Sequence, residues 1–464
     1  MALSSLFGRG LRRVLARLGS AARGSVAAGT LGVLTLAAGC AGPAPLTPEQ
    51  KDLNLRSFDE VWVTARDRNF DPTLGGVDWN AVKTELRPKV EQARTMDQAR
   101  AVMNQMLERL KQSHFGIIPA EFYGAVAGEE KAKDEGGQGN GETGIHLRLV
   151  DGQALIVRVD PGSSGDRAGV KPGWLLLRAG KASSADVIAK LRKAHGESIQ
   201  TLTYACFAFE RMLRGEVGST IELTLTGDSD ATLTKTVEFE APTGTATTLG
   251  NLPTFYVDFR SEELAVAGGS IGYLWFSAFL DPQHLMPRVT EAVSGFAGCR
   301  GIVIDMRGNP GGLGAMAMGV AGHFVPEQKK LGEMVTRDGT MKFLVFPRAR
   351  TFPGKLAILT DESSVSTAEI LAGGMKDLGR ARIFGTRTAG QALPSTVTRL
   401  PNGDGFQYAF ANYISAGGKA LEGDGVTPDV VVPPTRSALL AGRDPALEAA
   451  KAWILSDASE NKVQ

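Results

Sequence analysis

Residues 356–391 read LAILTDESSVSTAEILAGGMKDLGRARIFGTRTAGQ, and the rest of the chain is organised around them. The stretch opens with LAIL, an apolar run typical of a strand, and passes through a turn of small polar residues. Ser366 lies where strand gives way to helix, so its hydroxyl can be exposed at a sheet edge beside backbone N–H groups. The helix itself is predicted by apolar residues that recur at three- and four-residue spacings: Ile370, Leu371, Met375 and Leu378.

A simpler interpretation of this stretch is also available. Glu369 follows Ser366 by three positions, which is the spacing of a capping box at a helix N-terminus. For an isolated S-x-x-E sequence, a helix start with no chemistry is the usual explanation. The choice between a cap and a nucleophile therefore depends on the rest of the chain.

A second stretch, residues 301–312, reads GIVIDMRGNPGG. The apolar IVI predicts a buried strand, and Asp305 and Arg307 at its end are expected to support the turn that follows. The sequence Asn-Pro-Gly-Gly forces a tight turn with exposed backbone. Gly311 and Gly312 carry no side chain, so their N–H groups are suited to donate to an oxyanion.

Together these stretches resemble peptidase family S41, the carboxy-terminal-processing and tricorn-like serine proteases. The family pattern is a strand ending in D-x-R-x-N-x-G-G, followed by a small-residue turn whose nucleophile precedes a Glu by three positions. The resemblance implies Ser366 as nucleophile and an oxyanion hole formed by the N–H of Thr367 with Gly311 or Gly312. It also implies an α/β, crotonase- or ClpP-like core over residues 254–455, with a closing motif in LEGDGVTPD at 421–429.

The bulk composition is that of a globular protein with room for two or three domains. The 464 residues are 43% hydrophobic and 22% charged, and the net charge of +1 does not indicate nucleic-acid binding. The sequence contains no metal-ligand cluster, phosphate-binding loop or dinucleotide fingerprint. We therefore expect no cofactor and no metal.

Residues 1–40 are predicted to be a lipoprotein signal peptide. Five arginines and no acidic residue precede a short apolar run, and LAAGC at 36–40 resembles a bacterial lipobox in which Cys40 is lipidated. The position three before the cysteine is Ala37, where the pattern usually has Leu. The alternative is an uncleaved anchor, although the apolar run is short for a membrane span. Because Ala41 rather than Asp follows Cys40, we expect a cell-envelope lipoprotein that faces the periplasm from the outer membrane.

The mature chain is predicted to begin with a tether at 41–49 and a helical domain at 50–124, in which Thr95 followed by Gln98 predicts the start of a third helix. A second linker is expected at 241–253. The helical domain resembles that of the histidine-using S41 branch, whose last helix leads into a short signature containing His. Here that helix leads into QSHFG, which includes Ser113 and His114. A flexible, glycine-rich linker is expected at 125–143.

Residues 144–242 resemble a PDZ domain of the bacterial protease type, on the strength of VDPGS at 159–163 and AGVKPG at 168–173. Such domains capture an extended peptide and hold its terminal carboxylate on backbone N–H groups. The resemblance implies protein or peptide substrates with a free C-terminus, with Gly144 and Ile145 as the peptide-binding loop. Residues 193–217 are longer than a minimal PDZ domain needs.

One position separates two S41 mechanisms. The carboxy-terminal-processing branch uses a Lys after a G-x-x-T-x-G turn, and here that position is Gln391, which cannot act as a base. Lys376 would lie about three helical turns from Ser366. The tricorn-like branch implies His114 as the base, Glu422 as the group that orients it, and Ser113 between them.

These motifs predict a serine endopeptidase, and two other functions stay open. The same fold can bind ligands without cleaving them, and the PDZ-like domain can present partner tails at the membrane. Cys206 and Cys299 are expected to be separately buried thiols, since they are predicted to lie in different domains.

Overall fold

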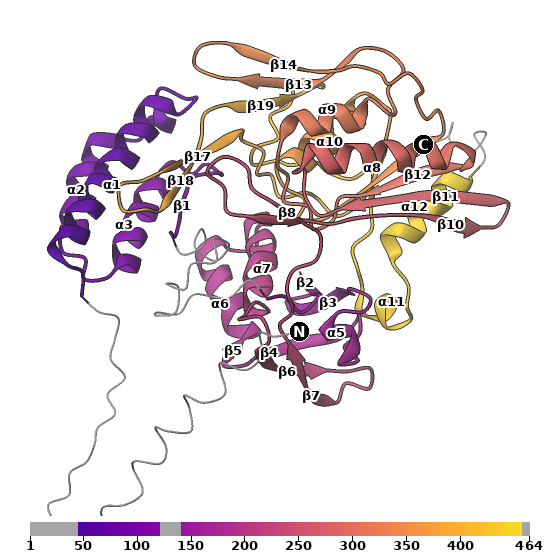
Figure 1. The fold of residues 1–464 in the computed structure, drawn as a ribbon, viewed down its shortest axis with the longest axis horizontal. Coiled ribbons are helices and arrows are strands. Elements are labelled where there is room, and N and C mark those ends of the chain that lie inside the picture. The colour runs from indigo at the N-terminus through magenta and orange to yellow at the C-terminus, as the bar shows by residue number, and fades with distance from the viewer. Residues whose placement is uncertain (1–44, 121–140, 457–464) are drawn as a thin grey trace, which may run out of the picture. The chain divides into compact units, whose positions relative to one another are not determined.

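The structure, a computed structural model, describes residues 45–120 and 141–456 (Figure 1). The predicted signal peptide, the lipidation site Cys40 and most of the expected linker at 125–143 lie outside these ranges. Within them, no helix combines the length and the apolar character needed to cross a membrane.

The N-terminal segment is helical, as predicted: α1 (Pro48–Arg68), α2 (Trp79–Glu91) and α3 (Met96–Glu108). Thr47 caps α1 by accepting the Gln50 N–H at 3.2 Å, so the helix begins inside the stretch expected to be a tether. Thr95 caps α3 in the same way through Gln98, as the sequence predicted. Apolar side chains from the helices form one core that includes Phe58, Leu86 and Met103.

The segment predicted as a PDZ domain forms a small β-domain. Its sheet has the order β2-β3-β4-β6-β7, with β2 at one edge and β5 paired to β4. The long region at 193–217 is mainly helical. The domain begins before residue 144, because Gly141 and Glu142 bridge to Gly215 and Glu240. Its elements are β2 (Ile145–Val150), β3 (Gln153–Val159), α5 (Ser164–Arg167), β4 (Leu175–Ala179), β5 (Ala182–Ser183), α6 (Ser184–His195), α7 (Ile199–Met212), β6 (Thr220–Thr226) and β7 (Thr232–Glu238).

The core is built on a mixed sheet in the order β10-β11-β12-β15-β16-β20. β10 is antiparallel to β11, and every other neighbouring pair is parallel. This confirms the strands expected at 301–305 and 356–359. The strands are β10 (Phe259–Val266), β11 (Gly269–Phe276), β12 (Gly301–Asp305), β15 (Lys355–Thr360), β16 (Arg382–Gly385) and β20 (Val430–Val431).

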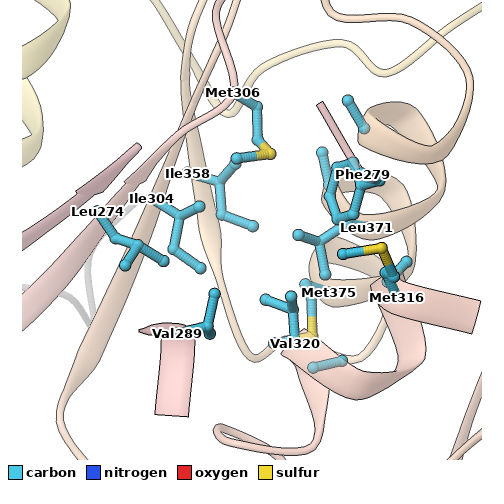
Figure 2. Packing of buried hydrophobic residues seen from close by; sticks show 14 of the residues in the cluster. Leu274, Phe279, Val289, Ile304, Met306, Met316, Val320, Ile358, Leu371 and Met375 are labelled. Atoms are coloured by element: carbon cyan, nitrogen blue, oxygen red, sulfur yellow. The ribbon is translucent and has the colours of Figure 1, made fainter. Parts of the chain in front are cut away.

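Both faces of the central strands β12 and β15 are covered by helices, which explains why these two strands are mainly apolar and buried. Ile304 and Ile358 pack on α8 (Pro282–Gly295), α9 (Gly314–Ala321) and α10 (Thr367–Asp377), as Figure 2 shows for part of this cluster. Val303 and Leu359 point the other way, toward α12 (Pro445–Leu455). The polar residues that follow these strands are consequently brought to one edge of the sheet.

Smaller sheets join the remaining segments: β14-β13-β19, β8-β9 and β1-β18-β17. The β8 strand lies within the stretch expected to be an irregular second linker. The short helix α11 (Arg436–Leu440) precedes α12. These strands are β1 (Gly116–Ile118), β8 (Thr245–Thr247), β9 (Phe255–Val257), β13 (Lys329–Val335), β14 (Thr340–Val345), β17 (Ser395–Arg399), β18 (Gly405–Ala409) and β19 (Asn412–Ser415).

The helical segment is attached to the core by backbone pairing and by a buried ion pair. β1 runs antiparallel to β18, with Gly116 opposite Gln407. Arg100 of α3 pairs with the fully buried Asp404 through two hydrogen bonds of 2.8 and 3.0 Å. Breaking such a pair leaves an uncompensated buried charge, so the attachment is rigid. Cys206 and Cys299 are both free and buried, which confirms the expectation of separate thiols.

Candidate active site

The predicted nucleophile lies on a strained strand-to-helix turn. β15 ends at Thr360, α10 begins at Thr367, and Ser366 precedes that helix with a φ of 56°. A positive φ is uncommon for a residue with a side chain and persists only where surrounding contacts hold it. The first N–H groups of a helix have no acceptor inside the helix, so the Thr367 N–H is available beside the Ser366 hydroxyl. This is the local form that exposes a nucleophile at the edge of a sheet.

The Glu369 side chain fixes the backbone of Ser366 by accepting its N–H. Its side chain is fully buried, and its Oε2 accepts the N–H groups of Ser366 and Gln391, both at 3.0 Å. Its Oε1 accepts the Thr388 hydroxyl at 2.6 Å and the Gly390 N–H at 2.8 Å. Burial raises the pKa of Glu369 to about 7, and these donors oppose the rise. The S-x-x-E spacing therefore does serve the helix start, and the same carboxylate clamps Ser366 to the 388–391 loop.

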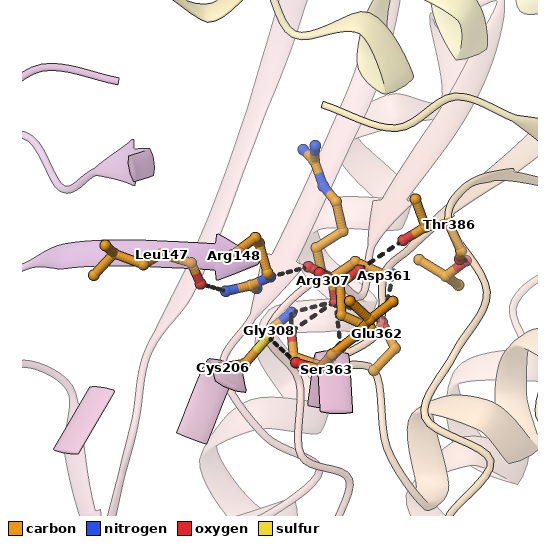
Figure 3. Close-up of polar contacts among 12 residues, drawn as sticks. Leu147, Arg148, Cys206, Arg307, Gly308, Asp361, Glu362, Ser363 and Thr386 are labelled. Atoms are coloured by element: carbon orange, nitrogen blue, oxygen red, sulfur yellow. Dashed lines mark hydrogen bonds and ion pairs between the residues drawn. The ribbon is translucent and has the colours of Figure 1, made fainter. Parts of the chain in front are cut away.

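A second buried carboxylate organises the turn before the nucleophile (Figure 3). Asp361 Oδ1 accepts the N–H and the hydroxyl of Ser363 at 3.0 and 2.6 Å, and Oδ2 pairs with Arg148 Nε at 2.7 Å. Burial alone would raise the pKa of Asp361, but the Arg148 charge and the Ser363 hydroxyl lower it. The sequence shows the Asp-x-Ser turn, but it contains no signal that Arg148 of β2 is the partner.

The strand end at 305–307 has the supporting role that the sequence predicted. Arg307 Nη2 donates to Asp305 Oδ2 at 2.6 Å and to Asp444 Oδ2 at 2.7 Å. The Tyr273 hydroxyl donates to Asp305 Oδ2 at 2.8 Å. These contacts satisfy Asp305 within the protein. The turn at 308–312 therefore begins from a fixed position.

His114 reaches the core through the strand that follows it. α3 ends at Glu108, His114 takes a φ of 60°, and β1 starts at Gly116 and pairs with β18. The Ser113 hydroxyl lies 2.8 Å from His114 Nδ1 and donates to Glu422 Oε2 at 2.8 Å. The Ser113 N–H donates to Glu422 Oε1, also at 2.8 Å. The structure thus brings Ser113 and His114, which share one sequence motif, together with Glu422 from the closing motif.

The hydrogen-bond pattern determines which imidazole nitrogen is basic. A serine hydroxyl has one proton, and Ser113 gives it to the Glu422 carboxylate, so His114 Nδ1 must supply the proton between His114 and Ser113. Nε2 then carries the lone pair that a general base needs. Burial lowers the pKa of His114 to about 4. Burial raises the pKa of Glu422, while donors from Ser113 and Ala392 oppose that rise.

The array of Ser113, His114 and Glu422 lies beside the nucleophile turn. Glu422 Oε2 also accepts the Ala392 N–H at 3.1 Å, and the carbonyl of the neighbouring Gln391 accepts the Ser366 N–H at 2.9 Å. Two successive loop residues therefore connect the orienting carboxylate to the nucleophile's own backbone.

The predicted oxyanion hole needs one correction. The Gly311 N–H donates to Asn309 Oδ1 at 2.9 Å, so this group is not free to bind an oxyanion. A Cβ at Gly311 would lie 2.7 Å from the Ser366 Cβ, which explains why the position has no side chain. Within the described ranges the structure shows no acceptor for the Gly312 N–H. The donors that fit are consequently Gly312 and Thr367.

Among the described residues, no lysine lies at this site in a position to act as the base. The backbone of Gln391 is engaged by Ser366 and Glu369, and its amide side chain cannot accept a proton in catalysis. Lys376 is held elsewhere, donating to the Thr427 carbonyl at 2.6 Å and pairing with Asp429 at 3.0 Å. This confirms that Lys376 is directed away from Ser366.

Sequence reasoning missed Tyr204 of α7, a residue of the small domain. Burial and the negative charge of Glu422 raise the pKa of the Tyr204 phenol, while the nearby Gln391 side chain lowers it. Tyr204 therefore lies close to the 388–391 loop. The only sequence signal was the unusual length of the 193–217 region.

The predicted peptide-binding residues line a cavity of about 670 Å³ between the small domain and the core. Gly144 has a φ of 69° and accepts the Asp160 N–H at 2.8 Å through its carbonyl. Ile145 is buried and opens the edge strand β2. Both residues therefore lie at the wall of the cavity, at the start of an edge strand whose backbone can pair with an added peptide.

Two family models match the chain. The model for peptidase family S41 matches residues 270–432, and the model for the tricorn protease C1 domain matches residues 55–108. The first range covers the core from β11 to the strand after the closing motif. The second covers most of the helical segment that precedes His114.

Several peptidases are similar to this chain in sequence or in fold. The chain is 25% identical over 391 residues to carboxyl-terminal-processing peptidase 3, chloroplastic, of Arabidopsis thaliana, covering 81% of this chain and 68% of that protein. It spans 52% and 55% of two bacterial relatives. The solved photosystem II D1 C-terminal processing protease superposes with a TM-score of 0.53 at 22% identity, covering 89% of this chain and 99% of that one. Mature CPAF superposes with a TM-score of 0.60 at 14% identity, covering 87% and 97%.

Proposed function

We propose that this chain, which belongs to peptidase family S41 and is a serine peptidase, cleaves protein substrates with Ser366 as nucleophile and His114 as general base. The observation that carries this assignment is the hydrogen-bonded array of Ser113, His114 and Glu422 beside the Ser366 turn. The Ser113 hydroxyl lies 2.8 Å from both Glu422 Oε2, to which it donates, and His114 Nδ1, from which it accepts, and the Gln391–Ala392 segment links the array to Ser366.

The chemistry follows from the proton positions. His114 Nε2 takes the hydroxyl proton of Ser366 as its oxygen attacks the scissile carbonyl, and the N–H groups of Gly312 and Thr367 stabilise the oxyanion. The imidazolium then returns the proton to the departing amine, leaving an acyl-enzyme. Water, deprotonated by His114, attacks the ester, and Ser366 recovers its proton when the acid product leaves.

The substrates that this proposal favours are proteins cleaved near a free C-terminus. Relatives named as carboxyl-terminal-processing peptidases support this choice. So does the small domain, in which Gly144 and Ile145 begin an edge strand beside a cavity, as a PDZ-like carboxylate-binding loop requires. The domain would thereby recruit substrate tails to the core.

The proposal includes a location for the protein in the cell envelope. The lipobox-like sequence ending at Cys40 supports an outer-membrane lipoprotein that faces the periplasm. The lipid would hold the peptidase at the membrane surface through the tether at 41–47.

A probe that phosphonylates active-site serines tests the peptidase assignment directly. A fluorophosphonate should label the wild-type protein on Ser366 and should not label Ser366→Ala. The binding-protein alternative, favoured by the presence of Gln391 in place of lysine, requires instead that neither protein is labelled. Cleavage of a protein with a defined C-terminal tail, followed by mass spectrometry, would then identify the bond that is cut.

A further inference from the structure

Helix α7 of the small domain presents an aromatic surface that the proposed chemistry does not use. Tyr204 and Phe207 are 36% and 38% exposed, respectively, although both are large aromatic residues. They are three positions apart and so lie on one face of the helix. The opposite face, with Cys206 and Phe209, is buried in the small domain. We call Tyr204 and Phe207 the aromatic face of α7.

This helix is attached to the nucleophile turn. The buried Thr203 hydroxyl donates to the Glu362 carbonyl at 2.8 Å, four residues before Ser366. The neighbouring strand β2 contacts the same turn through Arg148 and Asp361. The aromatic face is therefore held at the border of the core rather than directed to the outside of the small domain.

The two aromatic residues occupy successive positions along a path to Ser366. Phe207 lines the cavity between the domains, together with Gly308, Pro310 and Glu362 of the core. Tyr204 lies about one helical turn before Phe207 on α7, and its phenol is close enough to the Gln391 side chain and to Glu422 for both to shift its pKa. The Gln391 carbonyl accepts the Ser366 N–H at 2.9 Å. The aromatic face thus connects the cavity to the residue beside the nucleophile.

We propose that Tyr204 and Phe207 are specificity-determining residues that bind apolar side chains of an extended peptide between the cavity and Ser366. The inference rests on the proposed peptidase function. The occupant is a substrate peptide because the cavity that Phe207 lines is also lined by Pro310, the residue directly before Gly311 and Gly312 of the nucleophile site. Burying aromatic surface against apolar side chains supplies the binding energy. The small domain therefore selects sequence near the scissile bond.

The test compares two peptide series with the same scissile sequence, one with Leu or Phe and one with Ser at flanking positions. Each is cleaved by the full-length wild-type protein, Tyr204→Ala, Phe207→Ala and Tyr204→Phe. The matched control is Phe346→Ala, which removes a 63%-exposed aromatic residue that does not line the cavity. Tyr204→Ala and Phe207→Ala should lower kcat/KM for the apolar series about 10- to 100-fold, mainly through KM, because one apolar contact has an effect of this size. For the polar series, kcat/KM should change less than threefold in every variant. For both series, Tyr204→Phe and Phe346→Ala should change kcat/KM less than threefold.

A parallel measurement separates this inference from the proposed function. Binding of the same peptides to Ser366→Ala protein, followed by fluorescence anisotropy, should weaken by a similar factor when Tyr204→Ala or Phe207→Ala is added. If the wild-type protein neither cleaves peptides nor reacts with the fluorophosphonate while this loss of binding persists, the peptidase assignment fails and the assignment of the aromatic face remains. An unchanged preference for apolar peptides, or equal losses on both series and on a small ester, would overturn the inference.

Discussion

Ser113 and Glu422 lie 309 positions apart in the sequence and are joined by two hydrogen bonds of 2.8 Å, one from the Ser113 N–H and one from its hydroxyl. Each donor takes a different oxygen of the carboxylate, so the Glu422 side chain cannot rotate without losing both contacts. The arrangement fixes the orientation of Ser113 and, through it, the proton on His114 Nδ1. It is the contact by which the helical segment completes the site in the core.

We expect Ser366→Ala and His114→Ala each to lower kcat by about 10³-fold or more, because nucleophile and base act as one unit. Gln391→Ala should cost less than tenfold, since an amide at this position can only hold substrate or backbone. Cleavage rates should be compared for variants whose thermal unfolding matches that of the wild type. A folded His114→Ala protein that cleaves at nearly the wild-type rate would refute the Ser–His assignment.

Ser113→Ala and Glu422→Gln should each reduce kcat by about 10- to 10³-fold, less than His114→Ala, because the imidazole survives but loses its orientation. The two losses should not add in the double variant, since both changes interrupt the same connection. A double-mutant cycle on kcat/KM measures this coupling. Fully additive losses would mean that Ser113 and Glu422 act through different partners.

The pH dependence of the rate should lack the usual histidine ionisation. Because burial lowers the pKa of His114 to about 4, the neutral base predominates above that pH. We expect kcat/KM to rise with pH through about 4 and to stay level across pH 6.5, measured on a probe whose own chemistry does not titrate. A midpoint near 6.5 would show that the imidazole is exposed or paired differently in the working enzyme.

The same shift predicts a loss of stability in acid. His114, His146 and His323 all have pKa values lowered to about 4, mainly by burial. The unfolded chain takes up protons on these groups below about pH 6.5, whereas the folded chain does not until about pH 4. Their contribution to stability is therefore complete above pH 6.5 and declines as the pH falls from there toward 4. Because the raised pKa of Glu369 acts in the opposite direction over this range, the check is a difference between two proteins. The Tm of the wild type relative to that of His323→Gln should fall as the pH is lowered from 6.5 toward 4, and a relative Tm that rises on acidification would contradict the shift.

Glu369→Gln should lower the free energy of unfolding by about 2–6 kcal/mol, since replacing one carboxylate oxygen by NH₂ leaves two buried donors without an acceptor at about 1–3 kcal/mol each. Activity should fall as well, because the Ser366 N–H loses its position. Glu448→Gln is the matched control: Glu448 is also an acid in the first turn of a helix, but it makes only an exposed ion pair with Arg443. Its substitution should change stability by less than about 0.5 kcal/mol. Equal effects in the two variants would exclude the clamp.

Cys40→Ser should move the protein from the membrane fraction to the soluble fraction or leave the precursor unprocessed, because the thioether that carries the lipid can no longer form. Fractionation and intact mass measure both outcomes. Ala41→Asp would provide a comparison, as it keeps the cysteine and should change only the membrane in which the lipoprotein is found. An unaltered mass and distribution of Cys40→Ser would rule out lipidation.

Local sequence determined the elements that carry the chemistry. Apolar periodicity predicted β12, β15 and α10, and the S-x-x-E and N-P-G-G sequences predicted the two turns that meet at Ser366. The capping residues Thr95 and Gln98 predicted the start of α3. These features depend on residues within a few positions of each other, so their spacing along the chain is also their spacing in the fold. The sequence also shows directly that position 391 carries Gln and not the lysine of the carboxy-terminal-processing branch.

Tertiary structure alone decided how these pieces meet. The sequence named Gly311 and Gly312 as candidate oxyanion donors, yet the Gly311 N–H is taken by Asn309, because competition for one donor depends on where the Asn309 side chain points. It contained no sign that Arg148 would pair with Asp361 or that Tyr204 would reach Gln391, since both contacts cross from the small domain to the core. The bonds between Ser113 and Glu422 exist because β1 pairs with β18 and Arg100 with Asp404, which closes a loop of some three hundred residues. Spacing along a chain does not specify such closures, because they arise from the summed packing of whole domains.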